Sequence, residues 1–137
     1  MLSGEVDLFL ASLKRCLAQQ PEFVRHFYER FTGSSEEVRE KFRDTDMARQ
    51  VRMLEDSLFV VANAVQGAEG SIARGDLPRI AARHSRQDLA IRPELYDLWA
   101  ECLVETARQY DPAFRPEIEQ SWRAVLAVGV QYMRERY

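Results

Sequence analysis

The sequence contains few of the side chains that most often bind metals or form cross-links, because its 137 residues include only two histidines and two cysteines. Cys16 and Cys102 are far apart, and each falls on the apolar face of a predicted helix. Reduced cysteines in such positions behave as small hydrophobic residues. We therefore expect two reduced core thiols in preference to a disulfide.

The chain also lacks a strong charge of one sign and a long hydrophobic run. Its 19 basic and 22 acidic residues give a net charge of -3, which provides no electrostatic reason to bind nucleic acid. No uninterrupted apolar run reaches the roughly eighteen residues that a membrane-spanning helix needs. The first residues lack the basic-then-apolar arrangement of a secretory signal. We therefore expect a cytoplasmic protein that binds neither nucleic acid nor a membrane.

Length and composition predict one globular domain over residues 1–137. The chain is 46% hydrophobic and 30% charged, a balance that is typical of soluble folded domains. A chain of this length buries roughly two thirds of the surface that its unfolded form exposes, which supports one core of ordinary size. No internal repeat or low-complexity tract divides it.

Hydrophobic spacing predicts helices along the chain and no convincing strand. Apolar residues recur at intervals of three and four, the period of a helix with one buried face. The predicted helices cover residues 3–20, 21–33, 34–42, 45–65, 76–84, 93–110 and 116–133. Gly33 is interpreted as a helix stop and Ser34 as the start of a capping box. Thr45 is expected to cap the long fourth helix. The fold class is therefore all-α, although this pattern alone selects no topology.

His84 lies on the apolar stripe of the short helix predicted over residues 76–84, in line with Leu77, Ile80 and Ala81. An imidazole that faces a helical core is either a hydrogen-bonded core residue or a metal ligand. The other histidine, His26, is expected to be exposed or to make a surface hydrogen bond. The choice between the two interpretations of His84 depends on residues upstream.

Four upstream residues have ordinary explanations when each is taken alone. Tyr28 fits a core aromatic whose hydroxyl bonds to a carbonyl, and Phe42 carries no signal by itself. Gln50 fits a solvated residue at the edge of a buried stripe that includes Leu54, one helical turn away. Their order and spacing relative to His84 are more informative than their separate identities.

That order resembles the bacterial single-domain haemoglobins and the haem domain of flavohaemoglobins, over essentially the whole chain. The segment Pro93-Glu94-Leu95-Tyr96-Asp97 carries the most specific part of the resemblance. The other matching segments are Phe27-Tyr28-Glu29-Arg30-Phe31, Val38-Arg39-Glu40-Lys41-Phe42, Gln50 to Leu54, and Leu77-Pro78 through Arg83-His84. The resemblance implies a globin fold, a helical sandwich around a pocket for haem b, or iron protoporphyrin IX.

The resemblance also implies a role for each matching residue. His84 would be the proximal iron ligand, and Phe42 would pack on the macrocycle. Tyr28, Gln50 and Leu54 would line the opposite, distal side, where Leu54 would set the pocket volume. The remaining cofactor contacts implied are Ile80, Arg83 and Tyr96, with Arg83 and also Arg92 as candidate partners of the haem propionates.

The implied function is reversible binding of dioxygen or another diatomic ligand such as nitric oxide, for storage, transport or sensing, by a monomer or homodimer. Two departures limit the resemblance. The segment between His84 and Tyr96 is two residues longer than usual, and Trp122-Arg123-Ala124 stands where flavohaemoglobins have Trp-Gly-Glu. Two alternatives remain open. One is a nitric oxide dioxygenase or weak peroxidase that uses a separate reductase, and the other is a haem-free regulatory module.

Overall fold

The apolar residues spaced three and four apart form amphipathic helices in the computed structural model, which describes residues 3–19, 22–66 and 91–135. The helices are α1 (Ser3–Leu17), α2 (Glu22–Ser34), α3 (Glu36–Lys41), α4 (Met47–Gln66), α6 (Glu94–Tyr110) and α7 (Pro116–Glu135). The described residues contain no strand. The predicted helix over residues 76–84, with Ile80, Arg83 and His84, lies outside the described residues.

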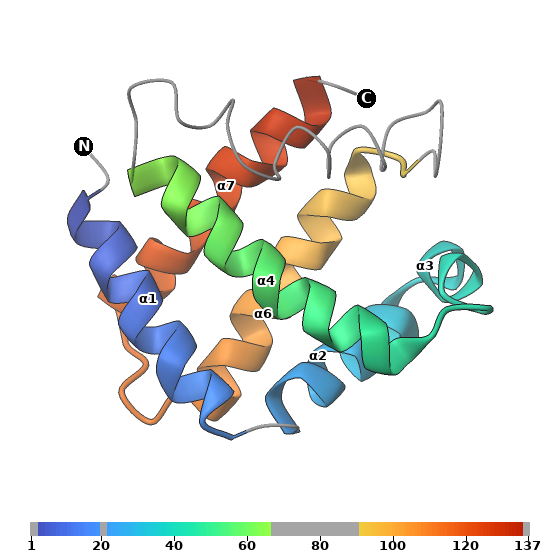
Figure 1. Ribbon diagram of the computed structural model, residues 1–137, viewed down its shortest axis with the longest axis horizontal. Helices are drawn as coiled ribbons and strands as arrows, with labels where there is room; N and C mark the ends of the chain where they lie inside the picture. The colour runs from blue at the N-terminus through green and yellow to red at the C-terminus, as the bar shows by residue number, and fades with distance from the viewer. Residues whose placement is uncertain (1–2, 20–21, 67–90, 136–137) are drawn as a thin grey trace.

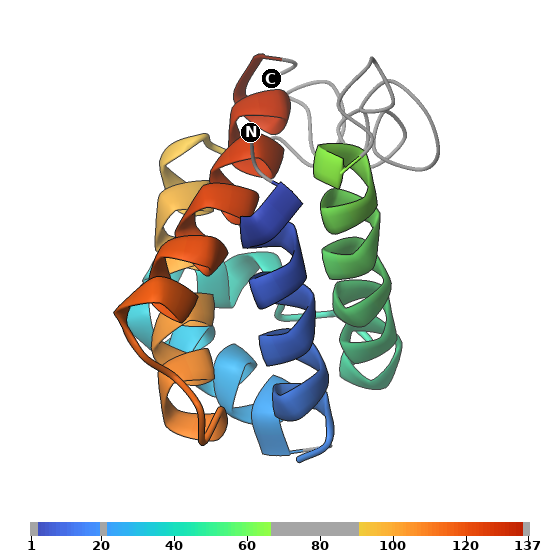
Figure 2. The same cartoon turned by 90° about the vertical axis from the view of Figure 1, so that its left-hand side faces the viewer.

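The helices pack as a sandwich in which neighbours in space are often distant in sequence. α1 packs against α7 and α4, while α6 packs against α2 and α7. Figure 1 shows α4 crossing in front of α6, and Figure 2 shows these two helices on opposite sides of α1. Among the described helices, none is both long and apolar enough to cross a membrane.

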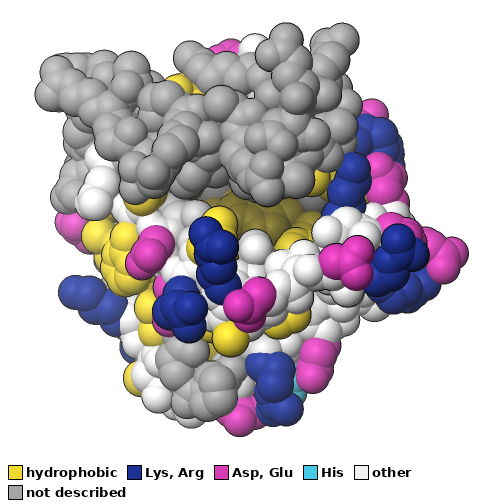
Figure 3. All heavy atoms as spheres, turned by 45° about the vertical axis from the view of Figure 1, so that its right-hand side comes forward, with side chains coloured by type: hydrophobic (Ala, Val, Ile, Leu, Met, Phe, Trp, Pro, Cys, Tyr) yellow, Lys and Arg dark blue, Asp and Glu magenta, His cyan; other side chains and the backbone are white. Residues whose placement is uncertain are grey.

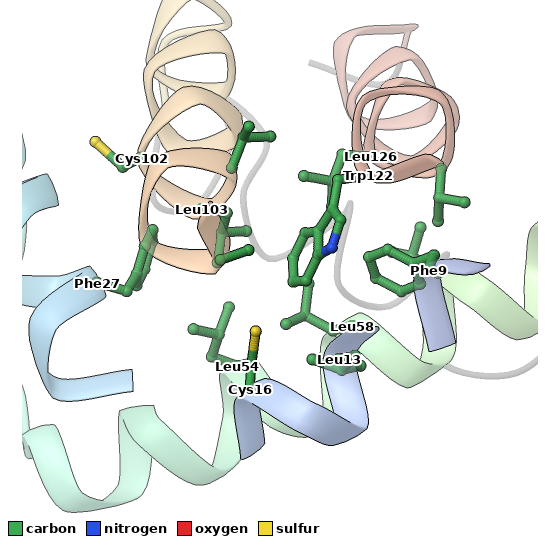
Figure 4. Close-up of a cluster of buried hydrophobic side chains, with 14 of the residues drawn as sticks. Phe9, Leu13, Cys16, Phe27, Leu54, Leu58, Cys102, Leu103, Trp122 and Leu126 are labelled. Carbon is green, nitrogen blue, oxygen red and sulfur yellow. The ribbon is translucent and has the colours of Figure 1, made fainter. Parts of the chain in front are cut away.

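A core of large side chains holds this arrangement together, as Figure 4 shows. Trp122 of α7 is fully buried and meets Phe9 of α1 edge-on, with ring centroids 4.7 Å apart. Leu58 of α4 and Leu103 of α6 complete the contact between layers. Each such side chain stabilises the fold by about 1.5–3 kcal/mol when fully buried. The core therefore fixes α4 relative to α1 and α7.

A buried polar chain ties α1 to the turn between α6 and α7. The Asp111 carboxylate accepts hydrogen bonds from Ser12 Oγ at 2.6 Å and from Arg15 Nε at 2.5 Å. The indole Nε1 of Trp122 donates to the same Ser12 hydroxyl at 2.8 Å. Because a buried polar atom without a partner is costly, this chain makes the local geometry specific.

Several details of the helix ends differ from the sequence predictions. Ser35, not Ser34, caps α3, and its side chain accepts from the Val38 N–H. Asp46, not Thr45, caps the start of α4, since its carboxylate accepts a hydrogen bond from the Arg49 N–H. Gly33 lies within α2 and does not end it. One-residue differences arise because neighbouring Ser, Thr and Asp side chains are all competent caps.

The cysteine prediction is confirmed, because Cys16 and Cys102 are both buried and unbridged. Burial raises the pKa of the Cys16 thiol to about 12. Burial likewise raises the pKa of Cys102, whose Sγ lies 3.9 Å from Ser34 Oγ. Both side chains are therefore neutral thiols at physiological pH.

Candidate functional site

Tyr28 lies on the side of α2 that faces the core and α4. The buried face of this helix consists of Phe23, Val24, Phe27, Tyr28 and Phe31. The Tyr28 side chain is only 6% exposed, and its ring meets that of Phe27 edge-on at 4.8 Å. The phenol is thus carried into an apolar environment, where its hydroxyl needs a partner.

Gln50 supplies that partner from the first turn of α4. Its side-chain Nε2 donates to the Tyr28 hydroxyl oxygen at 3.2 Å. The Tyr28 hydroxyl lies 3.5 Å from the backbone carbonyl of Gln50, which is long for an O–H···O hydrogen bond. Burial raises the pKa of Tyr28 to about 12, against the opposing effect of the Gln50 hydrogen bond. The phenol is therefore protonated at neutral pH and can donate.

Phe42 joins this pair from the end of α3. Its backbone N–H bonds to the carbonyls of Val38 and Arg39, so it closes the helix as the C-cap. The half-buried ring lies edge-on to Tyr28, with centroids 5.5 Å apart, and also meets Phe31 at 6.1 Å. The short α3 helix thus carries an aromatic ring to the ring of Tyr28.

Leu54 follows Gln50 by one turn of α4. It is 4% exposed and belongs to the core cluster that also holds Phe27 and Leu58, as Figure 4 shows. Of the residues predicted to line the distal side or to pack on the macrocycle, Gln50 and Phe42 each contact Tyr28. Leu54 lies on the same face of α4 as Gln50, by helical spacing.

The start of α6 carries Tyr96, which is 7% exposed in the first turn of the helix. Arg92, two residues before α6, holds the carboxylate of Glu37 and lies 3.4 Å from that of Glu94. Its expected role as a propionate partner gains no support from this pairing. The Glu37 contact was missed by sequence reasoning, because no periodic signal links positions 55 residues apart.

His26 points away from these residues. Its Nδ1 hydrogen-bonds to the Tyr110 hydroxyl, and the two rings lie 5.4 Å apart. The side chain is partly exposed near Glu29, as the sequence predicts. Within residues 3–19, 22–66 and 91–135, no group of three acidic, histidine or cysteine side chains is placed to hold a metal ion.

The surroundings are apolar. Figure 3 shows a hollow with a hydrophobic floor on one face of the molecule. Half-buried apolar side chains that pack on the core include Val51 and Phe59 of α4 and Leu98 and Trp99 of α6. The described residues therefore offer an apolar environment with two neutral hydrogen-bond donors, and no charged group among Tyr28, Phe42, Gln50 and Leu54.

Comparisons with known proteins agree with this architecture. A family profile described as Globin matches residues 10–133. Among solved structures, protein PA3967 of Pseudomonas aeruginosa PAO1, described as structurally highly homologous to a human hemoglobin, matches with a TM-score of 0.89. That protein is 32% identical to this chain, and the match covers 97% of this chain and 98% of that one. The comparison with curated proteins found no significant match.

Proposed function

This chain belongs to the globin family, and we propose that it binds haem b through His84 and holds a diatomic ligand, dioxygen above all, beside Tyr28 and Gln50. The observation that carries this proposal is the hydrogen bond between Gln50 and the buried Tyr28 hydroxyl, with Phe42 against the same phenol ring. When bound, haem supplies an iron with an open coordination position for such a ligand.

The described residues fit this cofactor by their chemistry. An apolar site excludes water, and a porphyrin is a large apolar group that gains from burial. The two donors are neutral, so they add no buried charge that would need a counter-ion. The site therefore suits a flat apolar cofactor with a small polar ligand on one side.

Tyr28 is the main donor to the ligand. Its O–H has only a long contact to the Gln50 carbonyl, so it can turn to a better acceptor at little cost. A hydrogen bond to a ligand with partial negative charge is worth about 1.5–3 kcal/mol, or about ten- to hundredfold slower release. Gln50 positions the phenol by donating to its oxygen, and it can also donate to the ligand directly.

His84 is the proposed iron ligand because the resemblance to the bacterial haemoglobins assigns it that place. The other histidine of the chain is His26, which is two residues from Tyr28 in α2 and therefore falls on a different side of the helix. Its Nδ1 hydrogen-bonds to the Tyr110 hydroxyl. Ile80, Arg83 and Tyr96 stay proposed as cofactor contacts on the strength of the resemblance.

Haemin titration of the purified protein tests this proposal. We expect a strong Soret band with one haem per chain in the wild type and in a His26→Ala control. His84→Ala should lose or weaken the band while retaining its helical circular dichroism, which shows that the variant is folded. A wild-type protein without a Soret band would contradict the proposal and favour the haem-free regulatory module.

Consumption of nitric oxide is a second candidate activity, with electrons from a separate reductase. A peroxidase is disfavoured, because Ala124 occupies the place of the glutamate and Arg123 pairs with Glu101 and Glu119 at the surface. Rapid mixing of the dioxygen-equilibrated protein with nitric oxide, with and without a reductase, separates the candidates. Repeated turnover that requires the reductase indicates a dioxygenase, and a single stoichiometric oxidation that the reductase does not turn into repeated consumption indicates storage or sensing.

A further inference from the structure

An ion pair between Glu37 and Arg92 joins the two segments that carry Phe42 and Tyr96. Glu37 lies in the first turn of α3, and Arg92 lies just before α6. The Arg92 Nη2 donates to Glu37 Oε1 at 2.7 Å. Its Nε lies 3.2 Å and 3.3 Å from the two carboxylate oxygens. The guanidinium therefore hydrogen-bonds to both carboxylate oxygens, a geometry that fixes the orientation of the two side chains as well as the distance between them.

This pair differs from most ion pairs around it. Arg39 with Glu36 and Arg43 with Glu40 each join residues three apart on one segment, so they restrain no second element. Glu37 and Arg92 are 55 positions apart. The hydrogen bonds from Arg92 hold the pKa of Glu37 below its usual range, so the carboxylate is charged throughout the neutral region.

The position of α3 makes such a restraint useful. Its close packing is against α2, and Figure 1 shows it at one edge of the molecule, beyond the end of α2. α3 has only six residues, and helices this short are not stable alone. Phe42 is its C-cap, so any loosening of α3 moves the ring that lies against Tyr28.

We propose that Glu37 and Arg92 form a clasp that holds the first turn of α3, the short helix that ends at Phe42, to the start of α6 and thereby slows the loss of haem. This inference rests on the proposed function. Both residues act as positioning residues, because neither is among those that meet Tyr28. Opening of the clasp frees α3 to move with Phe42, and the cofactor then leaves faster.

The rate at which haem transfers to an excess of a scavenging apoglobin measures the effect of the clasp on haem loss. Glu37→Gln and Arg92→Gln should each release haem roughly two- to fivefold faster than the wild type, the range of a well-formed exposed ion pair. The double variant should be no faster than Arg92→Gln alone, because that substitution already removes the contact with Glu37. High salt should speed release from the wild type and leave Glu37→Gln nearly unchanged.

Glu36→Gln is the matched control. It removes the same charge from the same turn of α3 and breaks the pair with Arg39, but it leaves Arg92 in place. Its haem release should match the wild type. Equal acceleration by Glu36→Gln and Glu37→Gln would overturn the clasp, because the effect would then come from helix charge alone. Wild-type release rates in both clasp variants would also overturn it.

Hydrogen exchange in the haem-free protein separates failure of the clasp from failure of the proposed function. Glu37→Gln and Arg92→Gln should speed exchange of the Phe42 amide and of the last turn of α3, with no change in α1. If the wild type binds no haem, the proposed function fails. Faster amide exchange in the two variants would then still show that the ion pair restrains α3. If haem binds and the variants change neither exchange nor release, only the clasp fails.

Discussion

The side-chain amide of Gln50 lies 3.2 Å from the hydroxyl oxygen of Tyr28 and donates a hydrogen bond that joins α4 to α2. The phenol oxygen accepts this hydrogen bond, so the phenol hydrogen is not used in it. That hydrogen has only a weak contact to the Gln50 carbonyl, at 3.5 Å. A ligand with negative character near this hydrogen would be a better acceptor. The predictions for the site follow from this arrangement.

Replacement of Tyr28 by phenylalanine should speed dioxygen release about ten- to hundredfold, since it removes the proposed donor and little volume. Stopped-flow replacement of dioxygen by carbon monoxide measures the rate. Tyr110→Phe is the control, because this hydroxyl bonds to His26 and not to Gln50. Unchanged release in Tyr28→Phe would transfer the role to Gln50 or to water.

The Tyr28 phenol should ionise only in strongly alkaline solution. Burial raises its pKa to about 12, whereas an unperturbed tyrosine ionises near pH 10. The folded-state pKa is the higher one, so the stability linked to this proton is present below about pH 10 and is lost as pH rises through 12. The difference in phenolate absorbance between the wild type and Tyr28→Phe gives the midpoint. A midpoint near 10 would contradict the burial of this group.

Substitution of Asp111 by asparagine should lower the free energy of unfolding by about 1.5–3 kcal/mol at neutral pH, because hydrogen bonds to a charged group are lost. Burial alone would raise the pKa of Asp111, but hydrogen bonds from Arg15 and Ser12 outweigh it and hold the pKa below its usual range. Its stabilisation is therefore present above about pH 3.9, the unfolded value, and is lost as pH falls through the lower folded value. Urea unfolding should show wild type and variant converging in acid. A constant difference would contradict the charge-based explanation.

Gly129→Ala should destabilise the fold by about 1–3 kcal/mol through overpacking. A Cβ at this position would lie 3.1 Å and 3.2 Å from the two terminal methyl carbons of Val61, where α7 meets α4. Gly33→Ala is the control, since a Cβ there meets nothing within 4 Å, and alanine favours a helix by about 0.8–1 kcal/mol over glycine. Thermal unfolding should move the two melting temperatures in opposite directions. Equal melting temperatures for the Gly129→Ala and Gly33→Ala variants would show that the Val61 side chain moves aside without destabilising the fold.

Much of the fold could be predicted from the sequence, because helical spacing is a local property. The periods of three and four predict helices that appear as α1, α2, α3, α4, α6 and α7 within a few residues of their observed ends. The caps were less predictable. Ser34 and Thr45 were chosen where Ser35 and Asp46 act, since the choice between adjacent polar residues depends on how the chain enters the helix.

The candidate site was predicted in part. The identities and order of Tyr28, Phe42 and Gln50 were sufficient to select them, and the structure brings these three together. The predicted roles of His84, Ile80 and Arg83 stay predictions, because they lie outside the described residues. The resemblance makes Arg92 a candidate propionate partner, whereas its contact with the Glu37 carboxylate could not be found from a one-dimensional pattern.

The sequence by itself determined the helical periods, the two reduced thiols and the set of residues that resembles a haem pocket, because each depends on residue type and local spacing. Only the tertiary structure decided which hydroxyl meets which amide, how Phe42 faces Tyr28, and that Glu37 reaches across to Arg92. These contacts join segments that are distant in the chain, and their geometry follows from the way in which helices pack around Trp122 and its neighbours. Packing of that kind is cooperative, so no single stretch of sequence contains it.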